Sequence, residues 1–184
     1  QIRNSSSVNF TNNEIINASG NGLLLTSSSG TFQNNIITES GLNGLLVTNS
    51  NGLVLSGNKV SNNNSKGIFA TQSSATLTDN EINDNGGGGL SASNSTLTFQ
   101  SNYVIGNGGC GISAGESSKV SGGENVAAAN YSGNICRNLT DKEKHLLVAY
   151  VYFHDENLEK TIRDAIDKPT GNINWSDLEG LTNI

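Results

Sequence analysis

Two pairs of acidic residues are the first candidates for a catalytic acid and base, because the members of each pair recur at one position of a repeating pattern. Glu14 and Glu81 occupy equivalent positions of a repeating pattern, and so do Glu39 and Asp84. If each repeat is one coil of a stack of strands, the first pair is separated by roughly 14 Å and the second by roughly 10 Å. Only the second separation approaches the upper limit for two carboxylates that hydrolyse a glycosidic bond with inversion.

The side chains that usually assist such carboxylates are sparse. Arginine and histidine are absent between residues 8 and 122, where Lys59 and Lys66 are the nearby cations, and both histidines lie beyond residue 140. The aspartate-rich glycine loops that bind calcium are missing, and Asp79-Asn80-Glu81 lacks the spacing of an EF-hand. We therefore expect no catalytic residues, no metal site and no cofactor in this segment.

A repeat of 22 or 23 residues determines where these side chains lie along the chain. Each copy carries an asparagine with an apolar residue three positions before it, another two positions after it, and a glycine nine positions after it. Two further apolar residues follow the glycine at alternate positions, and five copies in one register are not accidental. The asparagines are Asn13, Asn35, Asn58, Asn80 and Asn102, and the glycines are Gly22, Gly44, Gly67, Gly89 and Gly111.

The alternation within each copy is typical of short β-strands. Successive side chains of a strand point to opposite faces, so the apolar positions turn inward and the asparagine lies at a bend. Asparagine tolerates left-handed backbone there, and stacked asparagines can hydrogen-bond along the stack as a ladder. The glycine suits a corner that needs positive φ or a close backbone approach. The sequence predicts an all-β solenoid, a parallel β-helix with coils of about 22 residues and three strands per coil.

Other solenoids fit less well. A leucine-rich repeat needs Leu-x-x-Leu-x-Leu-x-x-Asn, which residues 8–122 lack, and a hexapeptide helix would show a six-residue period. The repeat resembles the right-handed parallel β-helix (pectate-lyase-like) family of polysaccharide lyases, epimerases and many bacterial or archaeal surface proteins. The Phe-x-x-Asn elements and the Gly-Gly-x-Gly-Ile segment at 108–112 are also similar to repeats of chlamydial polymorphic membrane proteins. The resemblance to the right-handed parallel β-helix family covers roughly residues 1–137 and implies the fold, while it leaves the activity open.

The composition changes at Thr140, where charged residues replace the runs of Asn, Ser and Gly. Asp155 is a good N-cap for a helix that Pro169 ends. The Phe-x-Asp-x-Asn-Leu motif at 153–158 and the Lys-Pro-x-Gly-x-Ile motif at 168–173 resemble the helical N-terminal cap of bacterial leucine-rich-repeat surface proteins of the internalin type. A private cap for the β-helix is the alternative. We expect a β-helix at 1–139, degenerate from about 116, and at 140–184 a helical linker or cap leading into a truncated leucine-rich-repeat domain.

One outward-facing column is apolar, a column being the residues at equivalent positions of successive coils. It lies on the strand that follows the repeated glycine, and two serines continue it. Three stacked apolar side chains on a polar rod indicate either a docking strip for a partner or for the apolar face of a sugar, or a surface that another segment covers. The strip residues are Leu24, Leu46 and Phe69, and the threonines that flank them are Thr26, Thr48 and Thr71.

Composition restricts the class of partner and the compartment. The net charge is −6 at pH 7, so the basic surface that a nucleic-acid partner needs is missing. No apolar run approaches the roughly 20 residues that span a bilayer. Low charge content, abundant Asn, Ser and Thr, and several Asn-x-Ser/Thr triplets indicate an extracellular or cell-surface location.

The repeating pattern already includes Gln1, so we expect this chain to be a piece of a longer protein.

The two cysteines, Cys110 and Cys136, are too few to define a disulfide framework. They fit either one disulfide of an exported protein or two buried thiols. Their positions lie in adjacent coils but three columns apart, which predicts that a direct disulfide would be strained.

These features favour a non-enzymatic extracellular scaffold or adhesin segment that binds a glycan or a surface protein. One alternative is a carbohydrate-active β-helix, a polysaccharide lyase or epimerase, whose catalytic coils lie outside this segment. Another is a self-assembling envelope or filament subunit, because the open ends of the stack expose strand edges and permit end-to-end self-association.

Overall fold

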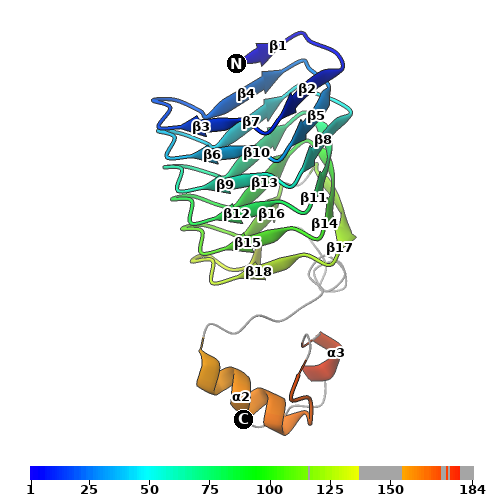
Figure 1. Ribbon diagram of the computed structural model, residues 1–184. Helices are drawn as coiled ribbons and strands as arrows, with labels where there is room; N and C mark the ends of the chain where they lie inside the picture. The colour runs from blue at the N-terminus through cyan, green and yellow to red at the C-terminus, as the bar shows by residue number, and fades with distance from the viewer. Residues whose placement is uncertain (116, 137–154, 171–172, 174, 179–184) are drawn as a thin grey trace.

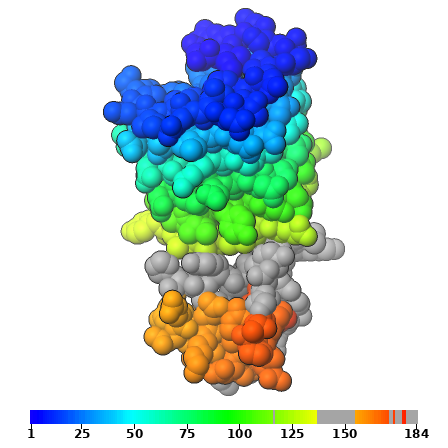
Figure 2. All heavy atoms as spheres, viewed as in Figure 1, coloured from blue at the N-terminus to red at the C-terminus, as the bar shows by residue number. Residues whose placement is uncertain are grey.

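A computed structural model describes residues 1–115, 117–136, 155–170, 173 and 175–178. Up to Cys136 the described chain winds as a parallel β-solenoid (Figure 1), which confirms the predicted fold class. In the space-filling view the coils form successive layers from the N-terminus onward (Figure 2). The expectations for residues 137–154 and 179–184, which include the end of the leucine-rich-repeat motif, lie outside the described residues.

Three parallel sheets form the walls of the solenoid, and each coil contributes one strand to each sheet (Figure 1). Sheet A contains β1 (Ile2–Arg3), β4 (Leu23–Thr26), β7 (Leu45–Thr48), β10 (Ile68–Thr71), β13 (Leu90–Ser93), β16 (Ile112–Ala114) and β19 (Ile135–Cys136). Sheet B contains β2 (Val8–Thr11), β5 (Gly30–Gln33), β8 (Leu53–Ser56), β11 (Ser74–Thr78), β14 (Thr96–Gln100) and β17 (Lys119–Gly123). Sheet C contains β3 (Glu14–Ile16), β6 (Ile36–Thr38), β9 (Lys59–Ser61), β12 (Glu81–Asn83), β15 (Tyr103–Ile105) and β18 (Val126–Ala128).

Columns of apolar side chains fill the interior, as the alternation predicts. In sheet B one column runs through Phe32, Leu55, Leu77 and Phe99, and each of these side chains is at most 1% exposed. Phe10 begins the same column in the first coil, where it is only half-buried and its ring centroid lies 5.9 Å from that of Phe32. The core is therefore continuous along the solenoid axis.

The repeated glycines are required by close approach and not by backbone conformation. A Cβ added at Gly67 would lie 2.4 Å from Ile82 Cγ2 and 2.8 Å from the carbonyl oxygen of Gly89. Gly44 meets the equivalent atoms one coil earlier, and neither glycine has a positive φ. Of the two reasons that the sequence left open for a glycine here, tight packing at the corner is the right one.

The left-handed backbone at the corners lies one residue earlier than expected. At the corner between sheets B and C, Asn34 has φ 53° and Asp79 has φ 55°, and each directly precedes a ladder asparagine. The ladder asparagines themselves are not among the residues with positive φ, so the expectation that they take left-handed backbone is wrong. Their side chains are instead committed to bonds between coils.

Asn58 illustrates these bonds. Its Oδ1 accepts hydrogen bonds from the backbone N–H and the Nδ2 of Asn35 at 3.0 and 2.9 Å. Its Nδ2 donates to Asn80 Oδ1 at 2.9 Å and to the carbonyl of Phe32 at 2.9 Å. The side chain thus satisfies backbone groups that water cannot reach at a buried corner. Bonds of this kind link Asn13, Asn35, Asn58, Asn80, Asn102 and Asn125.

Two further ladders occupy the other corners. In the serine ladder between sheets A and B, each hydroxyl accepts the backbone N–H of the serine one coil earlier and donates to a carbonyl two residues before it. All three corners of a coil are therefore bonded to the next coil through side chains as well as backbone. The second asparagine ladder, between sheets C and A, is Asn63, Asn85, Asn107 and Asn130, and the serines are Ser28, Ser50, Ser73 and Ser95.

Coils of 22 and 23 residues coexist because the extra residue is always placed at the corner between sheets A and B. One extra residue lies between Ser5 and Val8, a second between Ser50 and Leu53, and a third between Ala114 and Ser118. At the first corner the pairing with the next, shorter coil falls from a span of 23 residues to 22. At the other two the pairing with the preceding, shorter coil rises from a span of 22 residues to 23. The other two corners keep a constant length.

Two helices of the C-terminal segment are described, α2 (Glu156–Ala165) and α3 (Trp175–Leu178). Asp155 caps α2 as expected, since its Oδ1 accepts the backbone N–H groups of Asn157 and Leu158 at 2.8 and 3.2 Å. The helix ends at Ala165, earlier than the expected end near Pro169, because Asp167 adopts φ 53°.

The first prediction concerns the phase of the strands. Replacing Phe32 with alanine should lower the free energy of unfolding by about 3–5 kcal/mol, because it leaves a cavity in a fully buried column. Replacing the outward-facing Leu46 with serine should cost less than about 1 kcal/mol. Urea unfolding followed by circular dichroism measures both values, and equal losses would show that inward and outward faces have been exchanged.

The second prediction concerns the ladder. The change Asn58→Ala removes the partners of the Asn35 amide groups and of the Phe32 carbonyl. Each buried group left unpaired costs about 1–3 kcal/mol, so we expect a total loss of at least about 3 kcal/mol. The exposed Asn64 is the control, and its change to alanine should have little effect. The same unfolding measurement compares the two variants, and similar losses would argue against the ladder as a source of stability.

Candidate functional site

The strip residues lie side by side on the outer face of sheet A. Leu24 pairs in register with Leu46, and Leu46 pairs in register with Phe69. All three side chains are partly exposed, whereas the residues directly before and after each of them in the strand point into the core. The threonines predicted to flank the strip form the next outward column in the same register, which consists of Thr26, Thr48 and Thr71.

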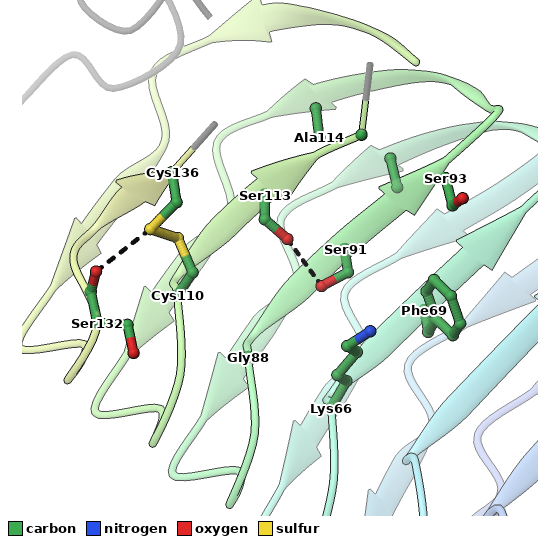
Figure 3. A pocket seen from close by; sticks show the side chains of 12 residues that line it. Lys66, Phe69, Gly88, Ser91, Ser93, Cys110, Ser113, Ala114, Ser132 and Cys136 are labelled. Atoms are coloured by element: carbon green, nitrogen blue, oxygen red, sulfur yellow. Dashed lines mark hydrogen bonds between the residues drawn. A yellow bond between two sulfur atoms is a disulfide. The ribbon is translucent and has the colours of Figure 1, made fainter. Parts of the chain in front are cut away.

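A hollow of about 500 Å³ follows the strip on the same face. The column continues from Phe69 to Ser91 and Ser113, whose small side chains replace bulky ones. Their hydroxyl oxygens are 2.9 Å apart and hydrogen-bonded to each other. Figure 3 shows Phe69 and Lys66 on one side of these serines and two cysteines on the other. The face thus combines an apolar strip with a polar recess.

Lys66 supplies a positive charge to this recess. Its Nζ lies 3.9 Å from the centroid of the Phe69 ring, a cation–π contact. Burial lowers the pKa of Lys66 below its usual value of 10.5, because partial loss of water disfavours the ammonium form. Within the described part of the chain no carboxylate forms an ion pair with Lys66. The recess therefore presents a partly desolvated cation that has no ion-pair partner among the described residues.

The two cysteines at the far side of the hollow form a disulfide (Figure 3). Their Cα atoms are 6.1 Å apart, within the range that a disulfide bridges, so an offset of three columns does not keep the two residues apart. An offset counted in columns assumes that the chain is extended. The chain instead bends at the corner that contains Gly111, and this bend brings Cys110 back toward Cys136 of the next coil. The bond ties β19 of the last coil to the coil before it.

The acidic residues considered for catalysis are not brought together. Glu14 and Glu81 lie on the outer face of sheet C with Ile36 and Lys59 between them in the column. Lys59 is the register neighbour of Glu81 on this sheet. All of these carboxylates are exposed.

The second acidic pair, Glu39 and Asp84, lies at the corner between sheets C and A. Both residues have positive φ, with values of 57° and 55°, and Asn62 of the intervening coil occupies the position between them. Their exposed side chains leave this corner next to the second asparagine ladder. They take part in the turn, and neither lines the hollow on sheet A.

Sequence reasoning missed the hollow and its lysine. Lys66 occupies the same column as Asn21 and Asn43. The Oδ1 of Asn21 accepts the backbone N–H of Asn43, and the Oδ1 of Asn43 accepts the backbone N–H of Lys66. Two changes in the sequence could have indicated the hollow. Asparagine gives way to lysine at Lys66 in this column, and Phe69 gives way to Ser91 in the column of the strip.

Two general absences apply to the described residues. They contain no group of three or more histidine, cysteine or acidic side chains arranged to hold a metal ion. Their helices are also too short and too polar for any of them to cross a lipid bilayer.

The third prediction concerns the disulfide. A Cys110→Ser, Cys136→Ser double variant should lose up to about 3.5 kcal/mol of unfolding free energy, given the loop of 26 residues that the bond closes. The loss should be local, with faster amide hydrogen exchange in β17, β18 and β19 and unchanged exchange in β5, β8 and β11. Hydrogen exchange read by mass spectrometry separates these strands, and a uniform change along the solenoid would contradict a local role.

Comparison with known proteins supports the architecture. A family model for right-handed β-helix regions matches residues 1–142. No curated protein and no solved structure matches the chain. The match includes more than half of the 184 residues and all the strands of the three parallel sheets. The chain therefore belongs to the right-handed β-helix family.

Proposed function

We propose that this chain is a non-enzymatic scaffold of an exported or surface-attached protein, and that the outer face of sheet A binds a glycan or a protein partner. The observation that carries the proposal is the alignment of Leu24, Leu46 and Phe69 in register, leading directly into a polar recess. Partly exposed apolar side chains stacked along a polar rod are typical of interaction surfaces. Adhesion is one role that such a face would serve.

The arrangement of charges favours binding over catalysis. Hydrolysis of a glycosidic bond uses two carboxyl groups that flank the bond at a defined separation. The acidic residues of the solenoid named above lie on sheet C and at its corner, away from the recess on sheet A. Lys66 stands in the recess without a carboxylate from the described residues.

The disulfide supports a location outside the reducing cytosol. Disulfides form and persist in oxidising compartments, and Cys110 and Cys136 are both partly exposed to solvent. The low charge content and the many Asn, Ser and Thr side chains point the same way. We propose an extracellular or cell-surface location on these grounds.

The C-terminal segment supports a modular parent protein. The cap at Asp155 begins α2 close to the position that the resemblance to leucine-rich-repeat caps implies, and Ile162 and Ile173 are buried. Burial of apolar residues from two parts of so short a segment indicates a folded unit. We propose that this unit caps a neighbouring repeat domain.

Self-assembly is a second candidate, because one end of the solenoid is an unpaired edge. Within the described chain β1, β2 and β3 each pair on one side only, and Val8 and Phe10 are partly exposed there. An edge of this kind accepts another coil, either from the same polypeptide or from a second copy. Sedimentation of the purified chain over a range of concentrations distinguishes these cases.

The fourth prediction tests the binding face. The purified chain should retain a glycan or protein ligand from a panel of acidic polysaccharides, neutral polysaccharides and surface proteins, without cleaving any of them. The change Leu46→Ser should weaken retention, because it removes the centre of the strip. Val54→Ser is the matched control, since Val54 is an outward apolar residue on β8 of sheet B and is 41% exposed.

Three results would change this proposal. Cleavage or epimerisation of a polysaccharide would replace it with the carbohydrate-active alternative. Equal weakening by Leu46→Ser and Val54→Ser would remove sheet A as the binding face. Retention that neither change affects would place the binding surface elsewhere on the chain.

A further inference from the structure

The spacing of the strip discriminates between partner conformations. Adjacent strands lie about 4.8 Å apart, so the strip from Leu24 to Phe69 spans about 9.6 Å. One face of an α-helix repeats about every 5.4 Å, and two turns cover about 10.8 Å. Alternate side chains of an extended chain are about 6.7 Å apart, and two such steps cover about 13.4 Å. A helix along the solenoid axis therefore matches the strip to about 1.2 Å, whereas an extended chain misses it by about 3.8 Å.

The chemistry of the strip favours apolar side chains of a polypeptide over a sugar. A sugar ring presents C–H groups that bind best to an open aromatic face. Leu24 and Leu46 have no such face, and one face of the Phe69 ring already carries the Lys66 ammonium at 3.9 Å. Aliphatic surface of this kind gains free energy mainly by burial against other aliphatic side chains.

The recess beyond the strip favours a carboxylate. Lys66 Nζ stands beside Phe69, and the described residues offer it no anionic partner. The hydroxyl groups of Ser91 and Ser113 line the same recess, and whichever of them accepts their mutual hydrogen bond can donate its own O–H to an incoming oxygen (Figure 3). Charge-assisted hydrogen bonds of this type are among the stronger ones in proteins. A carboxylate there would also offset the burial that lowers the pKa of Lys66.

We propose that the outer face of sheet A binds an amphipathic helix of a protein partner. Apolar residues at i, i+4 and i+7 of this helix rest on Leu24, Leu46 and Phe69, and a carboxylate about one turn farther along enters the recess beside Lys66. The inference rests on the proposed function, because it requires that this face is a binding surface. It adds the conformation, the polarity and the charge of the partner.

The experiment is a selection from a random library of peptides of about 18 residues, long enough to form a helix when bound. The intact chain is the target, and peptides that also bind the Leu46→Ser variant are removed first. Selected sequences should repeat apolar residues at helical spacing and carry Asp or Glu about one turn beyond them. Circular dichroism should show that the selected peptides gain helix on binding.

Affinity measurements with one selected peptide then separate the two parts of the surface. Fluorescence anisotropy should show that Leu46→Ser raises the Kd about tenfold or more, through loss of apolar burial. Lys66→Gln should raise the Kd severalfold and abolish the difference between the peptide and its Glu→Gln version. The matched controls Val54→Ser and Lys59→Gln, on the outer faces of sheets B and C, should leave the Kd unchanged. Affinity should also fall at alkaline pH, because the lowered pKa of Lys66 brings its loss of charge to a lower pH.

Several results would overturn the inference, and they do not all affect the proposed function. Peptides with a period of two residues, or without acidic residues, would exclude an acidic amphipathic helix. If no peptide is enriched but a polysaccharide is retained in a manner that depends on Leu46, the helix is wrong and the binding face remains. Self-association that depends on Leu46 would identify a second copy as the occupant. If no ligand of any class responds to Leu46→Ser, both proposals fail.

Discussion

The fixed register between successive coils is the constraint on which the rest of the structure depends. At each of the three corners a side chain of one coil accepts backbone N–H groups of its neighbour, so the corner groups are satisfied only when the coils are aligned. A shift of one residue would break all three ladders at once. It would also turn the side chains of every strand to the opposite face and expose the apolar columns. The hydrogen bonds at the corners and the burial of the apolar core therefore favour the same alignment of successive coils.

Those parts of the fold that this register governs could be predicted from the sequence. The spacing of Asn58 and its equivalents identified one corner, and the alternation around Phe32 identified the inward face. The second asparagine ladder was harder to recognise, because Ala18 and Ser40 occupy its positions in the first two coils. The serine ladder was hidden for a different reason, since serine is frequent at many exposed positions and its presence at a corner carries little information.

The candidate site lies on the outer face of sheet A. The register determines which residues lie side by side on this face, but it does not determine how their side chains contact one another. Alternation placed Leu46 and its neighbours outside, yet it could not show where the long side chain of Lys66 would lie. That position depends on contacts across the strands, with the Phe69 ring in the same coil and the space left by serines in the next two. The effect of the column offset on the approach of the two cysteines was misjudged for a related reason. Distances counted along an extended chain are too long wherever the chain bends, and Cys110 lies at such a bend.

The placement of all three extra residues at the corner between sheets A and B has a consequence for how this architecture can diversify. The corners built on the two asparagine ladders have one length throughout, so added residues there would shift the ladders. The serine corner has already absorbed a longer connection before β2, before β8 and before β17, and the strands on either side kept their pairing. Insertions and deletions in related chains should therefore concentrate at this single edge of the rod. It is also the edge where a new loop, an epitope or a whole domain could be grafted without remodelling the core.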